Sequence, residues 1–282
     1  MNQQNKKIIR KYTIIYTVVC LGISNIMWYA GYALFVKDEQ HPLAMTLIML
    51  TSFMPAFITL LMTKITKEGW ESLPLHPHPI AAFKTYLLAI ALTLLLVYLN
   101  DPLYLLLFKG NVTYAPEGCT LAGWLEVLFL CLLSLAMSVE MLGEELGWMG
   151  YLFPKLEALH GTVPSIALIG LVRTLWHVGI LVHMDHTLIS FLELLVSNIM
   201  CQSLLIYLTK KSNSVFPAAV SHGITLMAPI FIVYSEEFYA ANLLPMKFVG
   251  LISALLIGGL CFCLLHKEKL IVRANYIEDN LK

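Results

Sequence analysis

Residues 121–153, LAGWLEVLFLCLLSLAMSVEMLGEELGWMGYLF, form an apolar run that ends close to two adjacent carboxylates, Glu144 and Glu145. Residues 121–145 exceed the roughly 20 apolar residues that an α-helix needs to cross a bilayer. An ionised carboxylate inside such a helix is costly and usually marks a functional site. The stretch therefore predicts a membrane-spanning helix that carries a functional site near one end.

The composition of the whole chain agrees with this prediction. Of the 282 residues, 59% are hydrophobic and 13% are charged, about half the charged fraction of a soluble domain. We therefore expect an integral membrane protein. The formal net charge of zero gives no sign of a nucleic-acid partner. The six cysteines are scattered, without the spacing of a disulfide framework or a CxxC metal site.

The distribution of apolar residues predicts an all-α fold, a polytopic membrane bundle of about eight transmembrane helices. We expect one transmembrane domain over residues 1–282, with the motif-bearing core at about 100–240. No internal repeat divides the chain. The predicted spans are 12–36, 43–63, 85–107, 121–145, 162–183, 188–209, 214–234 and 246–266.

The basic residues support this segmentation and predict its orientation. Of the 18 lysines and arginines, all but four fall in segments that would lie on the same side as the N-terminus. Lys37, Lys109 and Lys247 fall on the other side, and Arg173 falls inside the fifth predicted span. Because cytoplasmic loops are enriched in Lys and Arg, we expect both termini to be cytoplasmic.

Four ionisable residues inside the predicted spans form the candidate site: Glu144, Glu145, His177 and His222. At a helical rise of about 1.5 Å per residue, these residues could meet in the inner half or the middle of the bilayer. A carboxylate shielded from water suits a general base. Because the residues come from three spans, we expect a site between helices. They could ligate zinc, but HExxH is absent, and we predict neither metal nor cofactor.

Three stretches resemble the motifs of a known family, the CAAX-protease and bacteriocin-processing (CPBP/Abi) intramembrane endopeptidases. GEELGWMGYLFPKL at 143–156 is similar to the first motif, a Glu-Glu pair followed four residues later by Arg, often within EExGWRGYL. GLVRTLWHVGIL at 170–181 resembles the second, an aromatic residue four before a histidine. SVFPAAVSHGITLM at 214–227 resembles the third, a histidine with an amide-bearing residue four further on.

This resemblance implies a role for each candidate residue. Glu144 would activate a water molecule to attack a peptide carbonyl, and Glu145 would support it by hydrogen bonding or by holding a partner. His177 would orient the water or the substrate, and His222 would stabilise the oxyanion of the tetrahedral intermediate. The family implies catalysis without a metal, and it includes prenyl-protein endopeptidases that remove a three-residue tail.

The sequence departs from the family pattern at three positions. Met149 stands where Arg is expected, Arg173 where an aromatic residue is usual, and Leu226 where an Asn is expected. We predict that Arg173 supplies from the fifth span the cation that Met149 cannot, by placing its guanidinium against Glu145. Asn198, in the sixth span, could supply the missing amide.

We therefore expect a membrane-embedded endopeptidase, possible roles being prenyl-protein processing, bacteriocin processing or self-immunity. One alternative is a catalytically inactive relative that binds a peptide or a membrane protein as a scaffold or regulator. Another is a proton-coupled transporter, although the paired broken helices typical of transporters are absent. The expected partners are a peptide or membrane-protein substrate and the lipid bilayer. The expected location is a bacterial plasma membrane, because no targeting segment is seen; the oligomeric state is left open.

Overall fold

The computed structural model describes residues 3–39, 41–108, 113–114, 120–183, 187–228, 232–233 and 235–267. Lys109 and the basic residues beyond 267, which entered the charge count above, lie outside these ranges. The helices are α1 (Gln3–Phe35), α2 (Pro42–Thr66), a 3₁₀ turn (Trp70–Ser72), α3 (Phe83–Tyr98), α4 (Asn100–Leu107), α5 (Leu121–Glu145), a π-helical segment (Leu146–Leu152), α6 (Phe153–His160), α7 (Thr162–Trp176), α8 (Val178–Leu181), α9 (Leu188–Ser212), α10 (Phe216–Met227) and α11 (Glu236–Lys267). Two short strands, β1 (Thr113–Tyr114) and β2 (Ile232–Val233), pair antiparallel.

The predicted all-helical bundle is confirmed, apart from this one strand pair. Among the described residues, six helical stretches are long and apolar enough to cross a membrane. They are Gln3–Phe35, Pro42–Thr66, Phe83–Leu107, Leu121–His160, Leu188–Ser212 and Ala240–Lys267.

The predicted count of eight spans is not confirmed. The segments 162–183 and 214–234 contain shorter helices, α7 with 15 residues and α10 with 12. The backbone leaves the helical conformation at His177 (φ −89°, ψ 0°) and at Ala228 (φ −58°, ψ 136°), which ends α7 and α10 within their apolar runs. The side of the membrane on which the termini lie stays a prediction.

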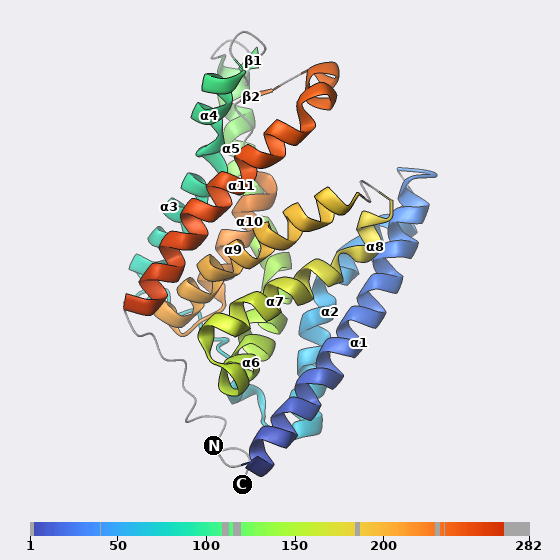
Figure 1. Ribbon diagram of the computed structural model, residues 1–282, viewed down its shortest axis with the longest axis vertical. Helices are drawn as coiled ribbons and strands as arrows, with labels where there is room; N and C mark the ends of the chain where they lie inside the picture. The colour runs from blue at the N-terminus through green and yellow to red at the C-terminus, as the bar shows by residue number, and fades with distance from the viewer. Residues whose placement is uncertain are drawn as a thin grey trace.

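The helices that carry the candidate site lie at the centre of the bundle (Figure 1). α10 packs against α5, α3 and α9, and α7 packs against α9. α1 and α2 pack together and cover one flank, whereas α3, α4 and α11 lie on the other (Figure 1). α9 is therefore a common neighbour of α7 and α10.

α5 shows how a helix is buried when its surroundings are lipid. Its buried face carries small residues, among them Gly123, Ser134 and Ser138, while large side chains such as Phe129 and Val139 are exposed. This inverts the pattern of a soluble protein, because lipid solvates large apolar side chains and small residues let helix backbones approach closely. The small face of α5 is the face that α10 covers.

Candidate active site

The two carboxylates of the first motif lie where α5 changes its helical geometry. Glu144 and Glu145 are the last two residues of α5, and the π-helical segment begins at Leu146. All seven residues of that segment are buried. π-Helical turns are rare and often occur at functional sites, because the wider turn redirects the side chains around it. Here it follows the residues that the sequence singles out.

Arg173 on α7 bridges the two carboxylates. Its Nη2 donates to Oε2 of Glu144 at 3.0 Å, and its Nη1 donates to Oε1 of Glu145 at 3.2 Å. All three side chains are at most 6% exposed. The predicted contact between Arg173 and Glu145 is confirmed, and the guanidinium contacts Glu144 as well. The two planar N–H groups of one arginine thus join neighbouring carboxylates that point apart on their own helix.

His222 on α10 contacts the same three side chains. Its Nδ1 lies 2.8 Å from Oε1 of Glu145, so the ring N–H donates to that carboxylate. Its Nε2 lies 3.4 Å from Nη2 of Arg173. Nδ1 is also 4.0 Å from Oε2 of Glu144. The cluster formed by Glu144, Glu145, Arg173 and His222, which we call the carboxylate cluster, therefore joins three helices.

His177 and Asn198 bond to residues of α7 next to the carboxylate cluster. The Nδ1–H of His177 donates to the backbone carbonyl of Arg173 at 2.7 Å, one turn earlier. The amide of Asn198 donates to the hydroxyl of Thr174 at 3.1 Å. Within the described part of the chain, neither side chain forms a hydrogen bond to Glu144 or Glu145. Both contact the segment that holds Arg173, and the catalytic role of His177 and the supporting role of Asn198 stay predictions.

The positions of the other two departures from the family pattern are also defined. Met149 lies in the π-helical segment and is buried in the apolar core. Leu226 is 48% exposed, and the neighbouring Thr225 donates its hydroxyl to the backbone carbonyl of His222 at 2.6 Å. In this structure neither position supplies a charge or an amide to the carboxylate cluster.

Asn25 on α1 is a supporting residue that the sequence analysis missed. Its amide donates to the carbonyl of Leu175 at 3.0 Å, and its Oδ1 accepts from the backbone N–H of Gly179 at 2.6 Å. It therefore bridges the break between α7 and α8, where His177 lies. The available signal was a lone amide inside an apolar span, since such groups need internal partners in lipid.

A close helix contact fixes the position of His222. A Cβ atom added to the next residue, Gly223, would lie 2.6 Å from the backbone nitrogen of Ser138 and 2.7 Å from the carbonyl oxygen of Ser134. Only glycine permits α10 to approach α5 this closely. The glycine therefore sets the distance between the helix of His222 and the helix of Glu145.

Gly223→Ala should lower the free energy of unfolding by about 1–3 kcal/mol, because an extra methyl group in a closely packed contact forces the helices apart. Thermal unfolding of the purified protein in detergent measures this loss. Gly250→Ala on α11 is the matched control, since an added Cβ there meets no atom within 4 Å. Equal stability of the two variants would contradict the close contact.

The carboxylate cluster has some of the chemistry of a metal site. Among the described residues, Glu144, Glu145 and His222 can offer ligand atoms that lie within 4.8 Å of one another. Arg173, however, directs its N–H groups at the carboxylate oxygens that a metal would use. A cation at this position would have to displace the guanidinium. The arrangement therefore fits a metal site poorly.

Comparison with known proteins agrees with the motif analysis. Residues 123–228 match the family described as type II CAAX prenyl endopeptidase Rce1-like. The match runs from α5 to the end of α10 and contains all four residues of the carboxylate cluster. The resemblance drawn from the three motifs is therefore confirmed. No curated protein matches the chain.

Proposed function

We propose that the protein is a membrane-embedded endopeptidase that hydrolyses a peptide bond with a water molecule activated by Glu144. The observation that carries the proposal is the carboxylate cluster itself. Four ionisable side chains from three helices meet in a buried site, inside the region that matches a CAAX prenyl endopeptidase family. Burying such a group in a membrane protein costs free energy, and ionisable residues at such positions usually mark a functional site.

The unequal burial of the two carboxylates supports Glu144 as the base. The side chain of Glu144 retains 6% of its surface, whereas that of Glu145 retains none. Nη2 of Arg173 donates a hydrogen bond to Oε2 of Glu144. The guanidinium favours the ionised carboxylate by direct attraction. Glu144 would accept a proton from water and later transfer it to the leaving amine.

The charges of Glu145, Arg173 and His222 would determine the net charge around Glu144. With both carboxylates ionised and Arg173 charged, the cluster carries one net negative charge, and a proton on His222 brings it to zero. Nδ1 of His222 donates to Glu145, and Nε2 lies 3.4 Å from Nη2 of Arg173, where the neutral ring accepts a hydrogen bond from the guanidinium. A proton taken up at Nε2 would replace this contact and give the ring an N–H that could stabilise the oxyanion formed when water attacks the peptide carbonyl.

Unpaired polar atoms beside these residues support a site that binds a polar group. Oε2 of Glu145 and Nε of Arg173 are buried and have no hydrogen-bond partner among the described residues. The indole nitrogens of Trp148 and Trp176 also have no hydrogen-bond partner among the described residues, and the centroids of the two rings lie 5.9 Å apart. Buried polar groups are nearly always hydrogen-bonded, so water or a peptide group is their expected partner.

The substrate class can be tested with matched peptides. We expect the purified protein to cleave a farnesylated peptide with a C-terminal CAAX sequence and to release its last three residues. The same peptide without the prenyl group should be cleaved more slowly, because it lacks the apolar anchor that brings it to a site in the membrane. Mass spectrometry of the products measures both rates, and equal rates would contradict a prenyl-directed specificity.

A further inference from the structure

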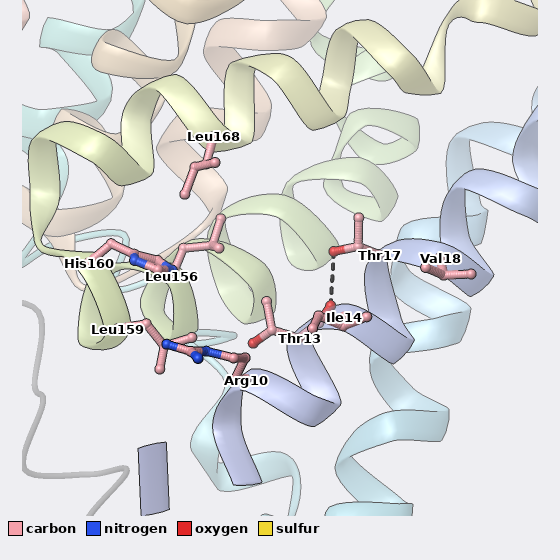
Figure 2. Close-up of a pocket in the computed structure, with 9 residues that line it drawn as sticks. All are labelled: Arg10, Thr13, Ile14, Thr17, Val18, Leu156, Leu159, His160 and Leu168. Atoms are coloured by element: carbon pink, nitrogen blue, oxygen red, sulfur yellow. Dashed lines mark hydrogen bonds between the residues drawn. The ribbon is translucent and has the colours of Figure 1, made fainter. Parts of the chain in front are cut away.

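A pocket is lined by residues of α1, α6 and α7. The pocket has a volume of about 340 Å³ and is drawn in Figure 2. Its walls are largely apolar, and they are built by Ile14, Val18, Leu156, Leu159 and Leu168. We call it the α1–α6 pocket. It shares no residue with the carboxylate cluster, and its volume falls in the range of about 300–1,000 Å³ typical of ligand sites.

One end of the α1–α6 pocket is basic. Figure 2 shows the guanidinium of Arg10 and the imidazole of His160 at the same end, with Val18 at the opposite end. Both basic side chains are exposed, and neither has a hydrogen bond or an ion pair among the described residues. Two donor groups without partners therefore lie together at the mouth of an apolar groove.

Two threonines that line the pocket differ in whether the hydroxyl group has a hydrogen-bond partner. The hydroxyl of Thr17 donates to the carbonyl of Thr13 at 2.9 Å, which removes its donor from the groove (Figure 2). Thr13 is only 5% exposed, and its buried hydroxyl has no hydrogen-bond partner within the described residues. The groove thus stays apolar toward Val18 and keeps one free hydroxyl a turn away from Arg10.

The surroundings of the pocket favour a lipid. Ile14 and Val18 are more than half exposed, as expected of side chains that face the acyl chains of a bilayer. Arg10 belongs to a basic N-terminal stretch with Lys6, Lys7 and Lys11. Basic residues at the membrane surface attract anionic headgroups. The helical walls use their backbone N–H and C=O groups internally, so they offer no extended edge to a peptide.

We propose that the α1–α6 pocket binds one anionic phospholipid. An acyl chain lies between the apolar side chains of α1, α6 and α7, and the headgroup phosphate accepts hydrogen bonds from Arg10 and His160. The proposal is independent of peptidase activity, since it concerns a different face of the bundle.

The test is native mass spectrometry of the full-length protein in detergent, with dioleoyl phosphatidylglycerol or dioleoyl phosphatidylcholine added at equal concentration. We expect the wild type to retain phosphatidylglycerol preferentially. Arg10→Gln should weaken that binding about tenfold, the effect of losing one charge-assisted hydrogen bond. Lys11→Gln is the matched control, because it removes the same charge from an exposed residue next along the helix that does not line the pocket. Equal loss in the two variants would overturn the proposal.

A second pair of variants tests the groove without changing charge. Thr17→Phe places a ring in the groove and should reduce retention of phosphatidylglycerol, whereas Ile15→Phe, on a lipid-facing position outside the pocket, should leave it unchanged. Binding that survives Thr17→Phe would place the lipid elsewhere. Displacement of the lipid by glycerol phosphate alone at equal concentration would show that only the anion is recognised, which would also overturn the proposal.

Discussion

Arg173→Met should lower the free energy of unfolding by about 3–5 kcal/mol, which is the usual cost of removing one partner from a buried ion pair. The substitution puts an unbranched apolar side chain in place of the guanidinium and leaves Glu144 and Glu145 without their cation. Thermal unfolding of the purified protein in detergent measures the loss. Arg173→Lys should be intermediate, because a single ammonium group cannot place two N–H groups on two carboxylates as a planar guanidinium does.

A combined variant separates charge compensation from simple packing. If the loss comes from uncompensated carboxylates, adding Glu145→Gln to Arg173→Met should recover part of the stability, because fewer buried charges then lack a partner. Lys11→Gln, at an exposed lysine that lines neither the carboxylate cluster nor the α1–α6 pocket, serves as the control and should change stability little. No recovery in the double variant would contradict the ion-pair explanation.

Glu144→Gln should reduce the rate of peptide cleavage by about 10²–10⁴-fold, the usual contribution of a positioned general base. The amide has the shape of the carboxylate but cannot accept a proton from water. Substrate binding and thermal stability should change far less than turnover, since the substitution also removes one of two adjacent negative charges. Single-turnover kinetics on a peptide substrate separate the chemical step from binding.

Glu140→Gln is the matched control for this experiment. Glu140 lies one turn before Glu144 on α5 and is half-buried, and the described residues give it no ion pair. We expect this variant to retain wild-type turnover. Equal turnover of the Glu144→Gln protein and the wild type would exclude Glu144 as the base.

The sequence analysis identified the helical bundle, whereas its count of eight spans is not confirmed. Among the described residues, six helical stretches are long and apolar enough to cross a membrane. Hydropathy counts apolar residues, so it detected each run of sufficient length, including 162–183 and 214–234. It does not detect where the backbone turns. α7 ends at Trp176 and α10 at Met227, although the apolar residues continue beyond both. The reason is local backbone geometry, which composition does not encode.

The site was more predictable than the span count. Depth along each span predicted that Glu144, Glu145, His177 and His222 could meet. The structure places His222 against both carboxylates, whereas His177 bonds to the backbone carbonyl of Arg173. The spacing also suggested that Arg173 replaces the cation missing at Met149. What the spacing could not give was the contact of Arg173 with both carboxylates, since that depends on how α5 and α7 pack.

Two local features escaped the sequence analysis for a physical reason. The argument from residues four apart assumes α-helical geometry, but Met149 lies in a π-helical segment that follows Glu145 directly. Asn25 forms hydrogen bonds with backbone groups about 150 residues further along the chain. These backbone groups become available only because α7 ends there. Neither the wider turn nor the broken helix has a distinct residue pattern.

The measurement that tests the central claim most directly is cleavage of a mixed library of free and prenylated peptides, followed by mass spectrometry. Purified wild-type protein is compared with the Glu144→Gln and Glu140→Gln proteins under the same conditions. We predict cuts in the wild-type and Glu140→Gln samples that are absent from the Glu144→Gln sample. Identical patterns in all three samples, including no cuts in any, would contradict a peptidase that uses Glu144, and would favour a membrane scaffold that kept the fold of the family without its reaction.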